Sequence, residues 1–387
     1  MFYIKFLFYF LIASTVFSQT VNIPDPVFKN RLINHSPTID TNSDGEIQIS
    51  EAILFSETIN VSGVSGATTG IEDLTGLESF TNIEGFEASF NFFENADFSG
   101  NIQIRDIVIN DTPLAQIELS SNTLLRGLSI SDSQLTNLDV TNNSELLLLQ
   151  ANFSNLGTLD LANNPSLQFL YVQQNQISSI NLNNNTNLVA LNISDNPLKT
   201  LNINNNLLLV FLNLRNLQLE TLNVSNNVDL EQLDIKNNQE LSYINLKNGT
   251  NEDLDISGGS STSNFEDLPA LVDVCIDDIN SNLANFIQSQ TSQAVSFSET
   301  CILSITESID ESFIKLYPVP AQEIVYLEAS IPIISIKVYD ILGQLVWAKA
   351  SHKGISHINI SHLTSGNYIF SLTNGDYITL NRLVCKK

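Results

Sequence analysis

The residues best suited to chemistry lie near the start of the chain, in the run D-T-N-S-D-G-E-I-Q-I-S-E from Asp40 to Glu51. Asp40, Asn42 and Asp44 place side-chain oxygens at alternate positions, and Glu51 supplies a further carboxylate. Oxygen atoms are the ligands that Ca²⁺ prefers, and Gly45 permits the sharp turn that would gather these ligands around one ion. The pattern therefore predicts a calcium-binding loop.

This run resembles the loop of EF-hand proteins, D-x-[DN]-x-[DN]-G-x5-E, at every required position. The resemblance implies that Glu46 contributes its backbone carbonyl and that Glu51 binds the ion with both carboxylate oxygens. The loop is single, however, and lacks the second loop with which it usually pairs. The alternative interpretation is a capping turn that is held by Asx hydrogen bonds and binds no metal.

Candidates for catalysis are scarce. The sequence has four histidines, and three of them lie near its end: His35, His352, His357 and His362. No motif of serine hydrolases, zinc peptidases, phosphate-binding loops or dinucleotide sites occurs. Acidic residues such as Asp139 and Asp160 recur at a fixed spacing, but a solvated ladder on an outer face explains them. We therefore expect a protein that is not an enzyme.

A period of 21 residues organises the middle of the chain. An apolar residue recurs at this spacing at Phe86, Ile107, Leu128, Leu149, Leu170, Leu191, Leu212, Leu233 and Leu254. A second series falls between these positions, at Ile117, Leu138, Leu159, Ile180, Leu201 and Leu222. Its next member, Ile244, comes one residue late, which predicts an insertion of one residue near Gln239.

Asparagine follows the second series at a constant distance of five residues. The six members are Asn122, Asn143, Asn164, Asn185, Asn206 and Asn227. Asparagine favours neither strands nor helices, so this regularity needs a structural cause. A solenoid supplies one, because a side-chain amide at each sharp corner can satisfy backbone groups that the turn leaves unpaired.

Residues 188–198, L-V-A-L-N-I-S-D-N-P-L, resemble the leucine-rich-repeat pattern LxxLxLxxNxL. The nearest similarity is to the short repeats of internalins and of other secreted bacterial repeat proteins. The resemblance covers about residues 70–260 and implies a right-handed coil with parallel β-strands. Such coils cannot bury their apolar faces alone, so we expect a cap at each end.

The two ends of the repeat region look like those caps. Residues 19–69 are expected to hold a short amphipathic helix from Pro26 to Asn34, followed by the candidate calcium loop. Residues 261–301 resemble the closing segment of similar repeat proteins. In an exported chain Cys275 and Cys301 would pair and staple this segment, and the alternative is two buried free thiols.

The chain also carries signals for export. Residues 1–18 read as a secretory signal peptide, with one charge at Lys5, an apolar run, and Val16 and Ser18 at the −3 and −1 positions before Gln19; the alternative is an N-terminal membrane anchor. Residues 1–312 carry nine Lys or Arg against 38 Asp or Glu, whereas residues 313–387 carry seven against four. So acidic a body should repel nucleic acid, and we expect a monomer that does not bind it.

The last part of the chain, 315–387, follows an acidic linker at 302–314 and reads as a small all-β sandwich. Runs of alternating apolar residues fall at 334–339, 344–349, 357–360, 367–372 and 377–384. The segment resembles the C-terminal sorting domain of type IX secretion, in the motifs at 315–321, 338–344 and 365–368 and in the basic end Lys386-Lys387. Val319 stands where this family usually has Asn. The alternative is an ordinary binding sandwich.

Together these patterns favour an exported leucine-rich-repeat protein that binds an extracellular protein or a polysaccharide. A binder should vary its exposed strand positions, and only the first series does so. The candidate ligand-binding residues are Gln150, Asn152, Tyr171, Gln173, Asn192, Ser194, Asn213, Arg215, Asp234 and Lys236. The alternatives are a structural surface component and a non-catalytic glycan-binding accessory protein. The resemblance implies that the tail interacts with the type IX machinery. The protein would pass through the periplasm and end at the cell surface or in the medium.

Overall fold

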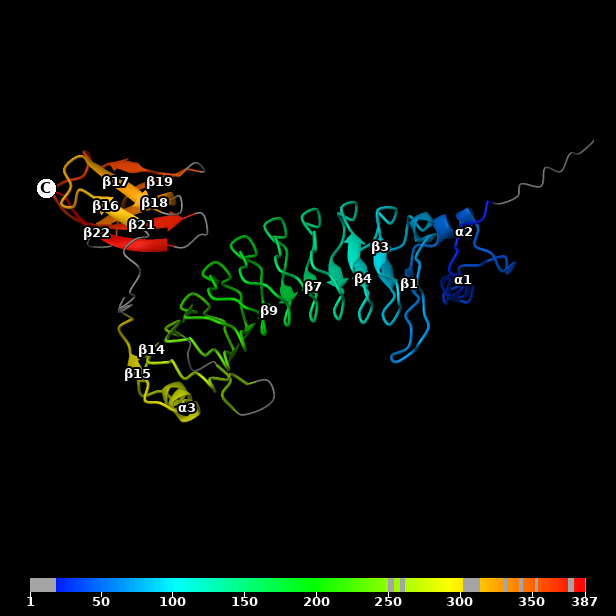
Figure 1. Ribbon diagram of the computed structural model, residues 1–387, viewed down its shortest axis with the longest axis horizontal. Helices are drawn as coiled ribbons and strands as arrows, with labels where there is room; N and C mark the ends of the chain where they lie inside the picture. The colour runs from blue at the N-terminus through cyan, green and yellow to red at the C-terminus, as the bar shows by residue number, and fades with distance from the viewer. Residues whose placement is uncertain are drawn as a thin grey trace, which may run out of the picture. The chain divides into compact units, whose positions relative to one another are not determined.

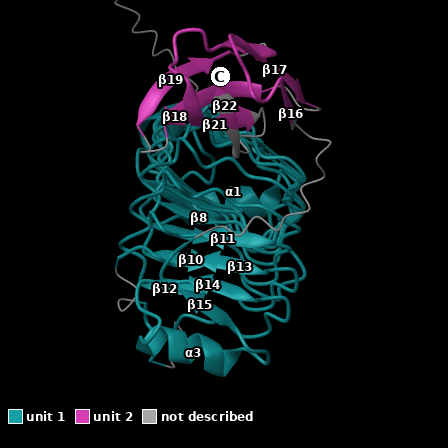
Figure 2. Ribbon diagram, turned by 90° about the vertical axis from the view of Figure 1, so that its left-hand side faces the viewer, with its two compact units in different colours: residues 1–301 teal, residues 302–387 magenta. Residues whose placement is uncertain are grey.

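The computed structural model describes residues 19–249, 254–257, 262–301, 314–329, 333–340, 344–351, 354–374 and 379–386. The expected signal peptide and all but the last residue of the expected linker lie outside the described residues. The chain divides into two compact units, residues 1–301 and residues 302–387 (Figure 2).

The first unit is a solenoid in which each coil contributes a three-residue strand to one parallel sheet (Figure 1). Within the described residues its strands are β1 Thr58–Asn60, β2 Gly85–Glu87, β4 Asp106–Val108, β6 Gly127–Ser129, β7 Leu148–Gln150, β8 Phe169–Tyr171, β9 Ala190–Asn192, β10 Phe211–Asn213 and β12 Gln232–Asp234. From β2 onward the register advances by one repeat per strand, as in Leu149 opposite Leu170 and Leu191 opposite Leu212. The expected repeat solenoid with parallel strands is confirmed. We call the outward side of this sheet the first-series face.

The second series forms two shorter parallel sheets. One pairs β3 Asn95–Asp97 with β5 Gln116–Glu118, and the other joins β11 Thr221–Asn223, β13 Tyr243–Asn245, β14 Asp273–Cys275 and β15 Ser296–Ser298. Leu222 lies opposite Ile244, so the predicted one-residue insertion is confirmed. The expectation for Leu254 was wrong. Asp234 bridges instead to Asn264, because the chain makes a longer excursion before it resumes the coil.

Two kinds of interaction stabilise the coils: packing of apolar side chains in the core and hydrogen bonds from buried asparagines. The central apolar residues of the strands are buried in one continuous core. Each asparagine of the predicted ladder is fully buried, and its amide donates to carbonyls of the preceding coil. In Asn164, for example, Nδ2 donates to the carbonyls of Val140 and Asn143, both at 2.9 Å. These two carbonyls also accept from the N–H groups of Asn143 and Leu146 in their own coil, so the amide adds a second hydrogen bond to each and links one corner to the next.

At the N-terminal end the helices α1 Pro26–Ile33 and α2 Ile49–Leu54 precede β1, and a short 3₁₀ helix, η1 Leu77–Ser79, lies between β1 and β2. Asp25 begins α1: its Oδ1 accepts hydrogen bonds from the backbone N–H groups of Val27 and Phe28. Its Oδ2 accepts from Glu72 and Asp73 of the first coil. One buried carboxylate therefore ties the cap helix to the repeats.

The C-terminal end of the solenoid is closed by helix α3 Asn282–Gln290, which buries Leu283 and Ile287. Cys275 of β14 and Cys301 form a disulfide, with their Cα atoms 5.3 Å apart. The predicted pairing is confirmed, and the bond fixes the end of the last coil against the sheet.

The second unit is built from two antiparallel sheets around its own core. One contains β16 Ile314–Tyr317, β17 Ile324–Ala329 and β20 His357–Asn359, and the other contains β18 Ile333–Asp340, β19 Leu345–Ala350, β21 Gly366–Asn374 and β22 Thr379–Lys386. The expected small β-sandwich is confirmed. In the parts of both units that the structure describes, no helix is long and apolar enough to cross a bilayer.

Candidate binding surface

The first-series face brings half of the predicted ligand-binding residues into one row. Side chains that directly follow the central leucines lie opposite one another on neighbouring strands. This polar row consists of Ser129, Gln150, Tyr171, Asn192, Asn213 and Asp234. Each is partly exposed. Neighbouring strands lie about 4.8 Å apart, so the row spans about 24 Å.

The second row that the sequence predicted is only partly available. Gln173 and Lys236 are half-buried and Arg215 is exposed, but Asn152 and Ser194 are 5% and 4% exposed. The expectation that Asn152 and Ser194 point outward was therefore wrong. All five predicted positions lie past the end of the three-residue strands, where the chain begins its corner. There the longer side chains of Gln173, Arg215 and Lys236 reach the surface, whereas the shorter ones of Asn152 and Ser194 do not.

The corners have their own ladder, which the sequence analysis did not identify. At each first-series corner one residue has a left-handed backbone, with φ between 52° and 62° from Phe90 to Asn237. The members are Phe90, Asp111, Asp132, Phe153, Gln174, Asp195, Asn216 and Asn237. Asn and Asp tolerate this conformation best, and their enrichment at these positions was the signal in the sequence.

Cations at the C-terminal end of the face are already paired. Lys236 Nζ lies 2.5 Å from Glu266 and 3.7 Å from Asp267, and Arg215 Nε lies 3.9 Å from Asp234. The hydrogen bond to Glu266 raises the pKa of Lys236. Burial raises the pKa of Asp234, although the N–H of Lys236 and the nearby cations oppose this. This end is thus a network of opposite charges rather than a free basic patch.

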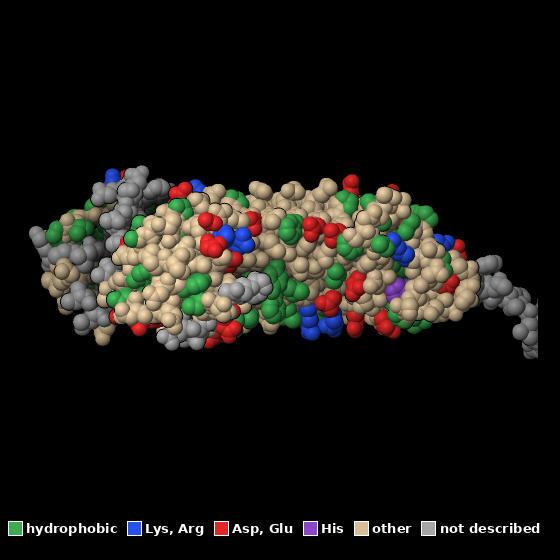
Figure 3. All heavy atoms as spheres, turned by 90° about the horizontal axis from the view of Figure 1, so that it is seen from below, with side chains coloured by type: hydrophobic (Ala, Val, Ile, Leu, Met, Phe, Trp, Pro, Cys, Tyr) green, Lys and Arg blue, Asp and Glu red, His purple; other side chains and the backbone are tan. Residues whose placement is uncertain are grey.

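Between this network and the first coils lies an apolar patch that sequence reasoning missed. Leu148, Phe169, Ala190 and Phe211, which precede the central leucines, lie opposite one another across β7 to β10. Leu147, Val189 and Val210, one residue earlier, are partly exposed beside them. Figure 3 shows hydrophobic side chains gathered midway along this face, with charged groups on either side. The signal was available, because both ends of a three-residue strand face outward.

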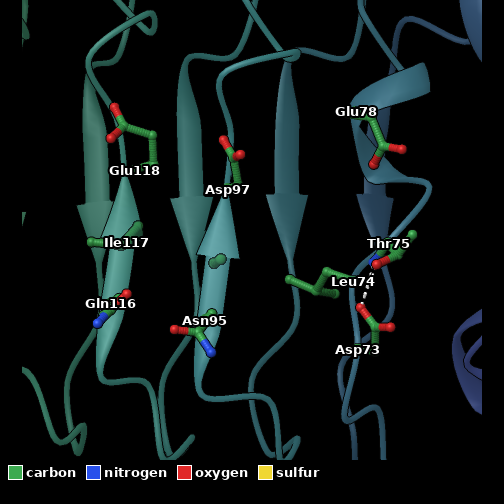
Figure 4. Close-up of a pocket in the computed structure, with 10 residues that line it drawn as sticks. Asp73, Leu74, Thr75, Glu78, Asn95, Asp97, Gln116, Ile117 and Glu118 are labelled. Atoms are coloured by element: carbon green, nitrogen blue, oxygen red, sulfur yellow. Dashed lines mark hydrogen bonds between the residues drawn. The ribbon is translucent and has the colours of Figure 1, made fainter.

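A hollow of about 630 Å³ lies on the second-series side (Figure 4). Four carboxylates line it: Asp73, Glu78, Asp97 and Glu118. Several of them accept hydrogen bonds from nearby backbone N–H groups, and this structural role accounts for their presence. Glu118 accepts from the N–H of Ser120 at 2.8 Å, as Asp97 does from Ser99. Hydrogen bonds from Ser120 lower the pKa of Glu118.

The same turn recurs in later coils. Thr141 and Ala162 donate to Asp139 and Asp160, and hydrogen bonds from Thr141 lower the pKa of Asp139. Glu118 and Asp139 therefore stay ionised and cap turns, and neither has the raised pKa that a general acid at neutral pH needs.

The loop from Asp40 to Glu51 is closed by its own hydrogen bonds. Asp40 accepts from the N–H groups of Asp44 and Gly45, and Asn42 donates to Asp44 at 2.9 Å. Glu51 accepts from Thr41 and from the backbone of Asn42 and Gln48.

Within the described ranges no group of three or more His, Cys, Asp or Glu side chains is arranged to hold a metal. The oxygen donors at Asp40, Asn42 and Asp44 fit Ca²⁺ by their chemistry, whereas Glu51 is committed to the loop backbone. Glu46 forms an ion pair with Lys29, at 2.6 Å between Oε1 and Nζ.

The backbone of residues 19–21 pairs with residues 47–49 of this loop, at the position where paired loops of this kind contact each other. The N–H of Val21 donates to the carbonyl of Ile47, and the N–H of Ile49 donates to the carbonyl of Gln19. Thr20 and Gln48 thereby form an antiparallel bridge. The residues directly after the expected signal-peptide cleavage site thus hold the single loop in place.

The described coils define the first unit as a leucine-rich-repeat solenoid. Residues 315–386 match the family described as the secretion system C-terminal sorting domain. The protein is accordingly exported by type IX secretion and attached to the cell surface or released from it. The tail implies an interaction with that secretion machinery. No curated protein matches the chain.

Solved structures with a similar fold include the functional domain of InlJ from Listeria monocytogenes, at 15% identity and a TM-score of 0.40, covering 95% of this chain and 98% of that one. A leucine-rich-repeat protein of Leptospira interrogans has 16% identity and a TM-score of 0.40, over 57% of this chain and 62% of that one. The leucine-rich-repeat ectodomain of the receptor kinase GASSHO1/SCHENGEN3 from Arabidopsis thaliana has 16% identity and a TM-score of 0.42, over 66% and 39%. These similarities concern the fold alone.

Proposed function

We propose that this protein is an exported recognition protein whose first-series face binds an extracellular macromolecule, either a protein or a polysaccharide. The observation that carries the proposal is the contrast between the two faces of one solenoid. The first-series face presents aromatic, aliphatic, amide and charged side chains from strands held in one continuous register. The second-series face repeats one residue type, with Asn181, Asn202 and Asn223 in equivalent positions. The side chains of Asn192, Asn213 and Asp234 make the same turn on the first-series face, but the equivalent positions there also include Gln150 and Tyr171.

The physical case rests on area and rigidity. A row of about 24 Å is long enough for a standard protein interface or for several sugar rings. Tyr171 and Arg215 are residue types that often dominate binding energy, and the amides of Gln150 and Asn192 can bond to hydroxyl or peptide groups. The strands are fixed by the stacked coils, so little conformational entropy opposes association.

The test compares two double variants of the full chain. Tyr171→Ala with Arg215→Ala changes the first-series face, and Asn181→Ser with Asn202→Ser changes the second while keeping an acceptor for each turn. Wild type and variants are applied to an array of purified polysaccharides and extracellular proteins. We expect wild type and the second variant to bind the same array members, and the first variant to bind at least tenfold more weakly, about 1.4 kcal/mol. Equal binding by all three would place the site elsewhere.

We also propose that the Asp40–Glu51 loop binds Ca²⁺ weakly. The side-chain oxygens of Asp40, Asn42 and Asp44 would hold the ion. The positive charge of the ion would then replace the hydrogen bonds that these oxygens now accept within the loop. Glu51 would have to give up its bonds to Thr41 and Gln48 to join them. This competition favours an affinity at the weak end of the known range, about 10⁻⁴ to 10⁻³ M.

A further inference from the structure

The apolar patch on the first-series face is a departure from the repeat rather than a requirement of it. The positions equivalent to Phe169 and Phe211 are held by Asp106 on β4, Gly127 on β6 and Gln232 on β12. The same backbone position thus tolerates a charged side chain, an amide side chain or no side chain at all in other coils. Four consecutive strands nevertheless carry Leu, Phe, Ala and Phe there, where partial exposure of the larger side chains to water brings no benefit to folding.

Phe153 is a second departure, at a corner that the polar row separates from the patch. It occupies a corner where the neighbouring coils have Asp132, Gln174 and Asp195, with φ at 53° and 44% of the residue exposed. A bulky aromatic residue is strained in this backbone conformation, and its exposure means that core packing does not compensate for the strain. Its N–H donates to the carbonyl of Gln173, which belongs to the corner of the next coil.

We propose that this patch anchors a polypeptide segment that carries apolar side chains close to lysines or arginines. The proposal rests on the proposed function and specifies the partner of that face. Phe169 and Phe211 would contact the apolar side chains, with Leu148 and Val189 packed around them. The polar row would bond to the backbone of the segment, and Phe153 would contact the segment on the other side of that row.

The chemistry of the patch favours a polypeptide over a polysaccharide. Sugar rings can stack their C–H faces on aromatic side chains, but the hydroxyls around the ring lose hydrogen bonds to water and need polar partners beside the stack. Here aromatic rings are interleaved with Leu and Val side chains, which offer no such partners. Mixed aromatic and aliphatic clusters bordered by amides are typical of the centre of protein interfaces.

The charge around the patch sets the sign of the partner. Residues 1–312 carry a large excess of acidic side chains. Arg126 is paired with Glu145 at 2.9 Å, and the cations at the other end of the face are paired as well. Asp111 and Asp132 lie on adjacent corners beside Phe153. A partner that brings Lys or Arg to this rim gains attraction and a faster approach, whereas an acidic partner is repelled.

The experiment uses a displayed library of random twelve-residue peptides, selected on the immobilised full chain. The selection is repeated on a variant with Phe169→Gln and Phe211→Gln, which copies the side chain of the equivalent position on β12. A third selection uses Phe153→Asp, which copies the neighbouring corners and relieves a strained residue, so it should not impair folding. Leu207→Ser with Leu208→Ser is the matched control, because it removes exposed apolar residues from a different corner.

We expect wild type and the matched control to enrich the same peptides, with apolar residues next to Lys or Arg. Measured by fluorescence anisotropy, these peptides should bind the two patch variants at least tenfold more weakly and should bind wild type more weakly as salt rises. Enrichment that does not differ between wild type and the Phe169/Phe211 variant would overturn the assignment, as would enrichment of acidic peptides.

The array experiment separates this inference from the proposed function. If the Phe169/Phe211 variant loses binding to polysaccharides and no peptide is enriched on wild type, the face is a recognition surface but the partner is not a polypeptide. If the patch variant and the Tyr171/Arg215 variant both bind every array member as wild type does, the face itself is excluded and both proposals fail.

Discussion

Replacing Asp25 tests whether one carboxylate couples the N-terminal cap to the repeats. Both oxygens of this residue, which is 8% exposed, accept backbone hydrogen bonds, two from the start of α1 and two from Glu72 and Asp73. Losing a helix cap costs about 1 kcal/mol. A hydrogen bond to a charged group contributes about 1.5 kcal/mol at the lower end of its range, so Asp25→Ala should destabilise the cap by about 4 kcal/mol.

The same carboxylate should make the cap sensitive to acid. Burial alone would raise the pKa of Asp25, but the four N–H donors outweigh it and the pKa is lowered. A group whose pKa is lower in the folded state stabilises the fold above its unfolded pKa of about 3.9, and this stability is lost as the pH falls through the folded pKa. Wild type should therefore lose cap stability below about pH 4, and Asp25→Ala should lose that part of the dependence.

Hydrogen exchange read by mass spectrometry is the suitable assay, because it resolves α1 from the central strands. Trp347, the only tryptophan, lies in the second unit, so its fluorescence would not report on the cap. Asp25→Asn is the informative control: its amide keeps one oxygen for α1 but turns a donor toward Glu72 and Asp73. It should protect α1 better than Asp25→Ala does. Unchanged exchange in α1 for both variants, at pH 7, would refute the reasoning.

Three further predictions follow from the ends of the chain. Cys275→Ser with Cys301→Ser should lower stability by about 3 kcal/mol, measured by urea unfolding of the solenoid, and equal stability would show that the disulfide contributes nothing. Ca²⁺ at 10 mM should stabilise the cap by about 1.4 kcal/mol if its dissociation constant is about 1 mM, and Asp40→Ala with Glu51→Ala should remove the effect; no change in melting temperature on adding Ca²⁺ or chelator would exclude it. Mature protein from the native host should lack the residues beyond about 315, and deletion of the tail should retain the protein in the periplasm; tail peptides found by mass spectrometry in the surface form would contradict this.

The parts of the fold that repeat could be predicted from the sequence, because each coil supplies an independent copy of the same signal. Twenty-one-residue spacing located the central residue of most strands, and the delay at Ile244 located the insertion. The asparagine ladder followed from its constant spacing, although its amides add second hydrogen bonds to corner carbonyls that the backbone already pairs. The sorting motifs predicted a sandwich, although β16 and β17 were not among the expected strands.

The parts that occur once could not be predicted in this way. The pairing of Gln19–Val21 with the Asp40–Glu51 loop depends on backbone groups and leaves no side-chain pattern. The strand β1 and the bridge from Asp234 to Asn264 depend on how single insertions are accommodated. Asn152 and Ser194 were assigned to the surface because alternation was extended past the end of a three-residue strand.

The candidate site illustrates why departures from a repeat are more informative than the repeat. In a solenoid each position is sampled by many coils, so the set of side chains that the backbone tolerates can be read from the molecule itself. At the positions of Phe169 and Phe211 that set includes Asp, Gly and Gln. At the position of Phe153 it includes Asp, Asn and Gln, with a second phenylalanine, Phe90, in an early coil. Folding therefore does not demand these aromatic residues, and Phe153 opposes folding through its strained backbone. Exposed aromatic residues that the fold does not require are best explained by contact with another molecule. These departures, rather than the asparagine and leucine ladders, therefore mark the surface to test first.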